Sequence, residues 1–386
     1  MKLYEVSNFI RKIINIIIGV VIVISLYIYV EPIASQLFLS VKPEDQPNIP
    51  YKVNRINFTI DPAFNLSLAN TRINYLGNPN SQWENLKTKK LKVYSYNFSS
   101  VEDIDYTPKA KGIALQLGYD DLNQRDNAEL SNKYVWVKNG LIFEIDKISK
   151  KMLQVPQQSN FASYKQYLSS GNFLTQEAPK PFVLNFLTST GRFTDKELKE
   201  LELEPQFIRF ESNNLVESNN IAAELSYVKV FRKLSELKVV SKRYEFPQIY
   251  FYVSSLRPEI ETNFKNYRFM HFKVNKLEYT PAFNEFEFDL IPIPTVVNDL
   301  KQGKFIISDM KFSGEAFAAT PNPSTTNIQT ITFDSYELGY YDNFEETINN
   351  EYIQPIYIFK GAVELDTGNR GRITVYTSAI NPIFVN

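Results

Sequence analysis

Eighteen consecutive uncharged residues near the N-terminus constrain this chain more than any other feature. Residues 13–30 read IINIIIGVVIVISLYIYV. A helix of that length spans about 27 Å at about 1.5 Å per residue, which is close to the hydrocarbon thickness of a bilayer. Asn15, Gly19 and Ser25 do not form the polar stripe that a helix on a soluble core would carry. We therefore predict a single transmembrane helix that anchors the chain in the lipid bilayer.

The charges that flank this segment predict its orientation. Residues 1–12 contain three basic side chains, whereas residues 31–50 contain one, Lys42. The positive-inside rule then places residues 1–12 in the cytoplasm as a short tail and everything after residue 30 on the outer side of the membrane. A cleaved signal peptide is the alternative. The length of the apolar segment and the lack of an A-x-A-like cleavage site favour an uncleaved signal anchor.

The composition excludes several kinds of chemistry. The chain has no cysteine and a single histidine, His271, so thiol nucleophiles, zinc sites built from Cys and His, and any Ser-His-Asp triad without His271 are excluded. The net charge of −1 does not predict nucleic-acid binding. We predict no cofactor and no metal site: the acidic loop at residues 120–129 has Arg125 and Asp126 where a calcium loop needs Asp or Asn and then Gly. His271 alternates with apolar neighbours and is interpreted as a structural residue.

Strand-like runs dominate after the anchor. In VNRINFTI and IALQLGY (residues 53–60 and 113–119) apolar residues alternate with polar ones, which is typical of half-buried strands. Asn139-Gly140 between KYVWV and LIFEID predicts a tight hairpin, and TGNRGR (residues 367–372) predicts another, with an anion-binding nest as the alternative for the second. Together with a Pro-rich and a Gln/Ser-rich stretch, these runs predict a stalk at residues 31–50, a first β-rich domain at 51–155, a linker at 156–177, and two copies of a repeated unit at 178–290 and 291–386.

The repeat is predicted from two similar segments. PFVLNFLTSTGRF (residues 181–193) and PTVVNDLKQGKF (residues 294–305) each begin with Pro and end with Gly, a basic residue and Phe, and they share Val, Asn and Leu at equal spacing. Proline in the first turn and glycine after the last are typical of short helices. Ser-Tyr and Ile-Tyr pairs follow each segment in the same order. We therefore predict a duplicated unit, with each helix packed on an antiparallel sheet through Leu187 or Leu300 and with Tyr250 equivalent to Tyr357.

The strand YIQPIYIFKG (residues 352–361) has a proline in its middle, and PQIYFYVSS is its predicted counterpart. Proline has no N–H to donate to a neighbouring strand, so Pro355 and Pro247 are predicted to mark an edge or a bulge in each sheet. The predicted fold class is thus α+β: a transmembrane helix followed by antiparallel β-rich domains with short helices packed on the sheets.

Three phrases carry a resemblance to a known type of protein. YVWVKNGLIFEID, AAELSYVKVFRKL, and SYELGYYDNF followed by EYIQPIYIFKG are similar to the strand-turn-strand phrases of PepSY-like modules and of YycH/YycI-type membrane-anchored extracytoplasmic bacterial proteins. The resemblance covers residues 50–386 loosely. It implies binding or regulation at the membrane surface, in some cases of a sensor kinase, and it supplies no catalytic residues.

Three functions remain open. We expect a non-enzymatic, membrane-anchored protein that binds or regulates another component of the cell envelope. The first alternative is a surface module for glycan or peptide that uses exposed tyrosines. The second is a carboxylate-dependent hydrolase, because Glu285 and Glu287 alternate on one strand at a spacing near that of inverting glycosidases. The candidate binding residues are Arg232, Tyr340, Tyr341 and Tyr357.

Overall fold

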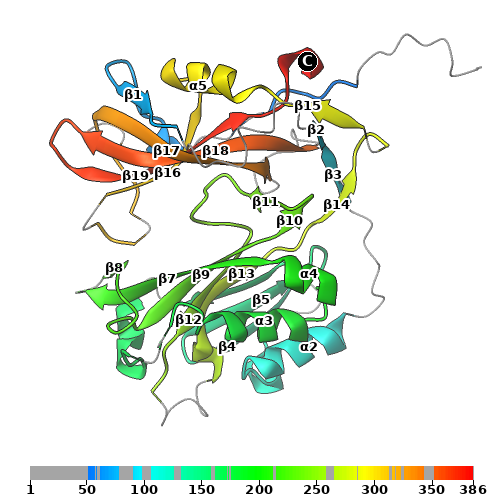
Figure 1. The fold of residues 1–386 in the computed structure, drawn as a ribbon. Coiled ribbons are helices and arrows are strands. Elements are labelled where there is room, and N and C mark those ends of the chain that lie inside the picture. Colours follow the sequence, from blue (N-terminus) through cyan, green and yellow to red (C-terminus); the bar gives the residue numbers. More distant parts are fainter. Residues whose placement is uncertain are drawn as a thin grey trace, which may run out of the picture. The chain divides into compact units, whose positions relative to one another are not determined.

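A computed structural model describes the chain from residue 51 to residue 385 (Figure 1), and Lys52–Asn386 form one compact unit. Inside that range the residues not described are 57, 59–60, 78–89, 98–105, 126–131, 158–160, 172, 174, 212–213, 258–264, 285, 313–314, 318, 323–325 and 343–351. The predicted tail, transmembrane helix and stalk, residues 1–50, lie outside the described residues.

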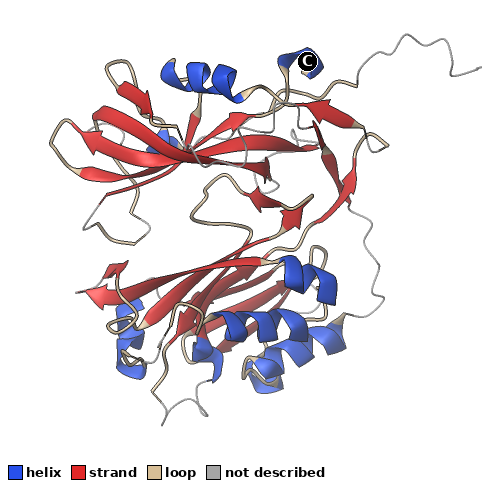
Figure 2. Cartoon of the chain, in the orientation of Figure 1, coloured by secondary structure: helices blue, strands red, loops and turns tan. Residues whose placement is uncertain are grey.

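The described chain is a strand-rich α+β structure whose strands pair mainly antiparallel (Figure 2), which confirms this part of the predicted fold class. Most strands belong to one of two large sheets, which we call the central sheet and the C-terminal sheet. The remaining short strands β2 (Lys90–Lys92) and β15 (Glu287–Asp289) pair with each other.

The central sheet has eight described strands in the order β4-β5-β6-β13-β12-β9-β7-β8, and all neighbours are antiparallel. Its strands are β4 (Lys133–Lys138), β5 (Leu141–Asp146), β6 (Met152–Pro156), β7 (Glu202–Glu211), β8 (Asn214–Glu217), β9 (Leu225–Phe231), β12 (Ile249–Ser254) and β13 (Phe269–Val274).

Helices cover one face of the central sheet (Figure 1). They are α2 (Thr107–Gln116), α3 (Lys180–Ser189) and α4 (Asp195–Glu200), and their core contains Phe186 of α3 packed on Phe251 of β12 and Phe272 of β13. Pro181 lies in the first turn of α3, and Gly191, just beyond its C-terminal end, adopts the left-handed region at φ 59°. The opposite face carries a second aromatic core around Tyr227 and Tyr252, with the 3₁₀ turns η3 (Phe161–Tyr167) and η4 (Lys265–Arg268) beside it.

The C-terminal sheet follows the order β10-β11-β17-β18-β19-β16, and β1, β3 and β14 join it from outside that path. Its strands are β1 (Arg72–Tyr75), β3 (Tyr94–Asn97), β10 (Lys233–Leu234), β11 (Leu237–Val240), β14 (Glu278–Pro281), β16 (Ile306–Phe312), β17 (Ile328–Tyr341), β18 (Tyr352–Leu365) and β19 (Arg370–Ser378). The other described turns are η1 (Pro62–Phe64), η2 (Asp121–Asn123) and η5 (Pro382–Phe384).

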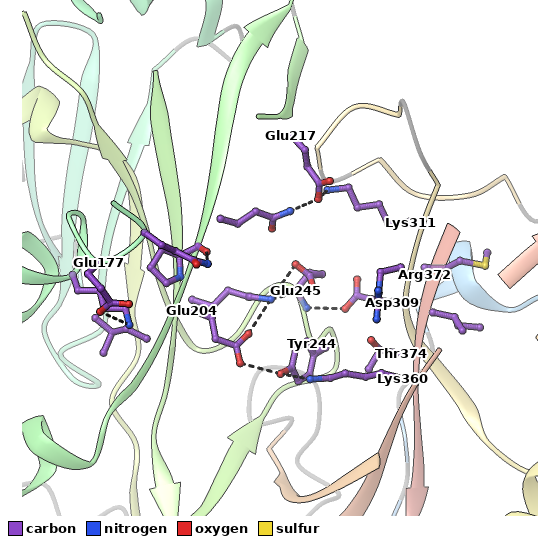
Figure 3. Close-up of a pocket in the computed structure, with 18 residues that line it drawn as sticks. Glu177, Glu204, Glu217, Tyr244, Glu245, Asp309, Lys311, Lys360, Arg372 and Thr374 are labelled. Carbon is purple, nitrogen blue, oxygen red and sulfur yellow. Dashed lines mark hydrogen bonds and ion pairs between the residues drawn. The ribbon is translucent and has the colours of Figure 1, made fainter. Parts of the chain in front are cut away.

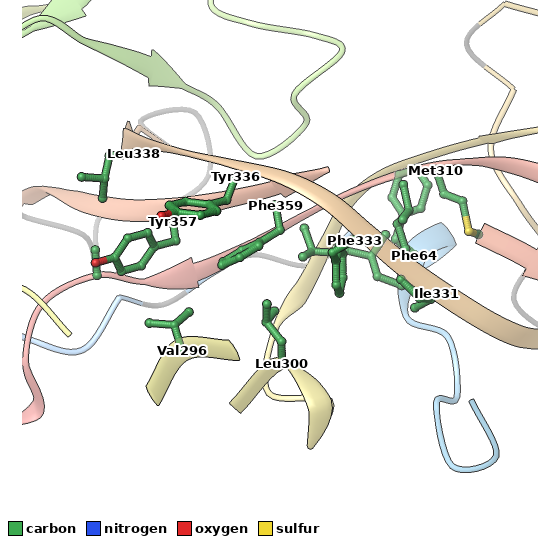
Figure 4. Close-up of a cluster of buried hydrophobic side chains, with 14 of the residues drawn as sticks. Phe64, Val296, Leu300, Met310, Ile331, Phe333, Tyr336, Leu338, Tyr357 and Phe359 are labelled. Atoms are coloured by element: carbon green, nitrogen blue, oxygen red, sulfur yellow. The ribbon is translucent and has the colours of Figure 1, made fainter. Parts of the chain in front are cut away.

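Helix α5 (Ile293–Lys301) packs on the C-terminal sheet (Figure 4). Val296 and Leu300, four residues apart on the same side of the helix, share a hydrophobic core with Phe333, Tyr357 and Phe359 of β17 and β18. The predicted helices at residues 181–193 and 294–305 are therefore confirmed, and so is the burial of Leu187 and Leu300.

A hairpin arm connects the two sheets. After β9 the chain leaves the central sheet, forms the short hairpin β10–β11, and pairs β11 with β17 of the C-terminal sheet in parallel register before it returns as β12. Residues 232–248 thus connect two strands of one sheet and also extend the edge of the other.

The predicted duplication is wrong at the level of the strands. After α3 the strands β7, β9, β12 and β13 follow one another across the sheet, whereas after α5 the first strand, β16, pairs with the last, β19. Tyr250 lies on the face of its sheet that is away from α3, while Tyr357 lies beneath α5. Side chains alternate between the two faces of a strand, so Tyr250 and Tyr357 are not at equivalent positions: one points away from its helix and the other points toward it.

The predicted domain division is also wrong. Strands β4, β5 and β6 lie in residues 51–155 or just beyond, yet they continue the sheet of β13, while β1 and β3 join the C-terminal sheet. The predicted linker, residues 156–177, contains the turn η3, and Tyr164 within it is buried and donates a hydrogen bond to the Gly140 carbonyl at 2.7 Å. Sequence proximity failed here because the sheets are assembled from strands far apart along the chain.

Two local predictions can be compared directly. IALQLGY was expected to be a strand, but it lies mostly in α2, where Ala110, Ile113 and Ala114 are buried at helical spacing and Leu115 is 67% exposed. Pro108 in the first turn favours the helix, a signal that the alternation obscured. Among the described residues of VNRINFTI, only Val53 forms a β-bridge, to Val385.

Both predicted hairpins are confirmed. Asn139 and Gly140 adopt positive φ values of 52° and 74° between β4 and β5, as a type I′ turn requires. The TGNRGR segment connects β18 to β19, with Gly368 at φ 83°.

Pro355 does not lie at a sheet edge, because β18 is between β17 and β19. It lies one residue before the ladder with β19 begins. Ala379 donates its N–H to the Pro355 carbonyl at 3.2 Å, and the Ala379 carbonyl accepts instead from the N–H of Ile291 at 2.8 Å. The missing prolyl N–H therefore leaves no unsatisfied acceptor. Pro247 precedes β12 and is outside the strand.

Candidate functional site

The described residues contain a polar cleft of about 560 Å³ between the two sheets (Figure 3). One wall is formed by residues 203–206 of β7, and the other by residues 309–311 of β16 and 372–374 of β19. Five acidic and five basic side chains line it. They are Glu177, Glu204, Glu217, Glu245 and Asp309, and Lys180, Lys229, Lys311, Lys360 and Arg372.

Tyr244, from the arm between β11 and β12, lies at the centre of the charged side chains. Lys360 donates to its phenol oxygen at 2.8 Å, and Lys238 approaches the same oxygen at 3.4 Å. The phenol in turn donates toward Glu204 at 3.3 Å and toward Glu337 at 3.4 Å. Because burial, followed by the neighbouring carboxylates, raises its pKa far above the ordinary value, Tyr244 stays protonated.

Glu204 connects this centre to the central sheet. It accepts from Lys238 at 2.6 Å and pairs with Lys229 at 3.3 Å. Burial would raise the pKa of Glu204, but the ammonium groups of Lys229 and Lys238 outweigh it and lower the pKa from 4.5 to about 2. Burial would lower the pKa of Lys238, but Glu337 and Glu204 raise it above its ordinary value. Lys238 of β11 and Glu204 of β7 therefore hold the two sheets together as an ion pair.

A second ion pair lies deeper, between Arg243 and Asp309. Arg243 Nε and Nη2 donate to one carboxylate oxygen at 2.9 and 2.8 Å, and the N–H of Glu245 donates to the other at 2.8 Å. Burial raises the pKa of Asp309 from 3.8 to about 6, although Arg243 acts in the opposite direction. Both oxygens of Asp309 are thus engaged by the arm.

Arg372 differs from the other charges in the cleft. It is exposed and has no ion pair within the described part of the chain. In the register of β16 and β19 it lies directly opposite Lys311, which pairs with Glu217 across the cleft. Two like charges opposite each other on a sheet repel, so this part of the cleft favours an anionic group.

The four predicted binding residues do not form a common site. Arg232 lies at the end of β9, where it donates to the Leu277 carbonyl, pairs with Glu197 at 3.3 Å and stacks on the ring of Tyr279. Its contacts are those of a structural cation.

The three predicted tyrosines are buried, which contradicts their expected role as an exposed binding face. Tyr340 and Tyr357 lie in the core of the C-terminal sheet, where their hydroxyl groups donate to the carbonyls of Lys92 at 3.0 Å and Ile291 at 2.7 Å. Tyr341 lies on the opposite face and packs on Tyr376 and Phe58. Cross-strand aromatic packing accounts for these rings.

The other sequence candidates are separate from the cleft. Glu287 is exposed on β15, and Asp289 pairs with Lys90 at 3.4 Å; Glu285 is outside the described residues. His271 contacts the hydroxyl group of Tyr250 at 3.1 Å and stacks on Tyr252. Burial lowers the pKa of His271 to about 4, so its ring is neutral near pH 7.

The sequence contains a signal for the cleft that does not take the form of a motif. Charged residues interrupt strongly apolar strands at Lys229 in YVKVF, Asp309 in IISDMKF and Lys360 in IYIFKGAV. A charge within a buried strand requires a partner, and such partners lie far away in sequence. The local sequence pattern therefore does not identify which charged residues pair with each other.

Comparisons with known proteins add no relative. No protein-family model matches the chain, and no curated protein or solved structure matches it at a significant level. No group of metal-ligating side chains occurs among the described residues. Within the same residues, no helix has the length and apolarity needed to cross a bilayer.

Proposed function

We propose that this chain is a non-enzymatic, membrane-anchored protein whose extracytoplasmic part binds another component of the cell envelope and regulates it. The observation that carries the proposal is the cleft between β7 and β16, in which Arg372 is an exposed cation with no ion pair among the described residues. Such a group is available to a partner without first breaking an internal ion pair.

The remaining charges of the cleft support a binding role. Each lining carboxylate already contacts a cation: Glu204 and Glu245 contact Lys229, Asp309 contacts Arg243, Glu217 contacts Lys311 and Glu177 contacts Lys180. Among them Asp309 is buried and both of its oxygens are hydrogen-bonded, and a group that is already fixed in this way lowers the entropy cost of binding.

The proposed anchor is supported by the apolar residues 13–30, and its proposed orientation by the charges on either side of them; both can be tested separately. Protease added to intact cells or spheroplasts is expected to digest the chain beyond residue 50, because the positive-inside rule places that part outside. An epitope tag within residues 1–12 is expected to stay protected until the membrane is permeabilised. Full protection of the C-terminal part would contradict the proposed location.

The partner is tested by affinity purification of the full-length chain in detergent. We expect an envelope component to copurify, and Arg372→Glu to reduce its recovery at least tenfold because the variant replaces an attractive charge by a repulsive one. Arg370→Glu is the matched control. Arg370 is on the same strand two residues away, is exposed, pairs with Glu364 at 3.3 Å and does not line the cleft. Equal recovery by Arg372→Glu and the wild type would contradict the proposal.

A further inference from the structure

We propose that the open edge of β16 binds an extended peptide from the partner as an additional strand, and that this peptide alternates acidic and apolar residues. The proposal deepens the proposed function and rests on it. It adds main-chain hydrogen bonding to the charge of the cleft, so strand addition can fail while the proposed function stands.

Among the described strands, β16 lies at the end of the C-terminal sheet and pairs only with β19. The direction of its free main-chain groups follows from hydrogen bonds further along the sheet. Leu365 donates its N–H to the Asn369 carbonyl, and Ala379 donates its N–H to the Pro355 carbonyl. Hydrogen-bonded pairs alternate along an antiparallel ladder, so the odd-numbered residues of β19 direct their N–H and carbonyl groups toward β18, and the even-numbered residues direct theirs toward β16. Lys311 therefore shares its main-chain bonds with Arg372, and Met310 and Phe312 point their N–H groups away from the sheet.

These outward groups have few partners in the described residues. The Phe312 carbonyl accepts from Glu315 at 3.4 Å, while the Met310 N–H and carbonyl have no hydrogen bond there. A register shift between Ile307 and Asp309 ends the regular edge on one side, so the open stretch is short and lies along the cleft.

The facing edge of β7 is not equivalent. Pro205 is there, and its carbonyl accepts from the side chain of Gln176 at 3.3 Å, so this residue offers no N–H and no free acceptor to an added strand. Compared with the β7 edge at Pro205, the β16 edge at Met310 has both an N–H and a carbonyl for a new strand.

The chemistry of the peptide follows from the two faces of β16. Lys311 and Arg372 are on the cleft face, where Lys311 pairs with Glu217 and Arg372 has no ion pair among the described residues. A peptide side chain that lies across from Lys311 and reaches Arg372 is therefore expected to be acidic. Met310 and Phe312 are on the other face, within the hydrophobic core that contains Phe64. An added strand therefore places an acidic side chain toward the cleft and apolar side chains on either side of it.

The test uses the full-length chain in detergent and the labelled peptide Val-Glu-Val-Glu-Val-Glu-Val as probe, with binding measured by fluorescence anisotropy. We expect saturable binding that weakens at least tenfold when Lys replaces Glu in the peptide. Binding should also weaken at least tenfold when alternate peptide nitrogens on one edge are methylated, because methylation removes donors without changing charge. Methylation of the opposite edge is the matched control.

Amide hydrogen exchange of residues 306–312 provides an independent measurement. It uses the wild-type protein, so it does not depend on whether a substituted protein folds. We expect the exchange of this segment to slow when the peptide is bound. Binding that is insensitive to methylation on both edges, or that leaves the exchange of residues 306–312 unchanged, would overturn strand addition and leave the proposed function standing. Protection of this segment without peptide, in a dimer, would assign the edge to a second copy and also overturn the proposal.

Discussion

Leu300→Ala is expected to lower the free energy of unfolding by about 2–5 kcal/mol. Leu300 is 1% exposed, points from α5 into the core of the C-terminal sheet (Figure 4), and shares that core with Phe333 and Phe359. Truncation removes the transfer free energy of the deleted groups and leaves a cavity that the long strands β17 and β18 cannot close without shifting their pairing. Urea unfolding followed by circular dichroism measures the loss.

Lys301→Ala is the matched control, because Lys301 is the next residue of the same helix and is exposed. We expect it to change the free energy of unfolding by less than about 0.5 kcal/mol. Leu187→Ala, in α3 on the central sheet, should behave like Leu300→Ala, since Leu187 is 0% exposed. A loss below about 1 kcal/mol for Leu300→Ala would contradict the packing of α5.

Glu204→Gln is expected to cost about 2–3 kcal/mol of stability at pH 7, and the cost should disappear in acid. The folded state holds the pKa of Glu204 at about 2, below its ordinary value of 4.5, because Lys229 and Lys238 favour the carboxylate over the opposing effect of burial. A depressed pKa stabilises the fold at pH values above 4.5, and this contribution is lost as the pH falls toward 2. Urea unfolding of both proteins between pH 7 and pH 2 measures the difference.

The comparison between the two proteins isolates Glu204. Burial raises the pKa of Asp309 to about 6, so its titration has the opposite sign, but it is present in both proteins and cancels in the difference. Glu200→Gln is the control: Glu200 pairs with the exposed Lys196 at 3.8 Å, and its loss should cost less than about 0.5 kcal/mol. A stability difference for Glu204→Gln that stays constant between pH 7 and pH 2 would show that Glu204 does not act through its charge.

Local features of the fold could be predicted from the sequence. The helices at residues 181–193 and 294–305 have proline in the first turn, glycine beyond the last and apolar residues on one side, and each of these signals lies within one segment. The Asn139-Gly140 hairpin follows from backbone conformation alone. In IALQLGY the alternation predicts a strand and is wrong, because the segment continues a helix whose buried residues Ala110, Ile113 and Ala114 have helical spacing.

The arrangement of strands and the cleft depended on contacts between distant residues. The two similar helical segments, α3 and α5, are followed by strands that pair in different orders. Strand pairing depends on which strand faces are buried against each other, and this is not a local property of the sequence. The tyrosines predicted to form a recognition surface are buried, because a tyrosine in an aromatic core and one on a surface have the same local sequence pattern. Glu204, Lys238 and Lys360 meet at Tyr244 from strands up to 156 positions apart, and the low polarity of the protein interior makes each of these charges depend on the others. No short stretch of sequence predicts this arrangement of charges, because their interaction stabilises the protein only when both sheets are folded.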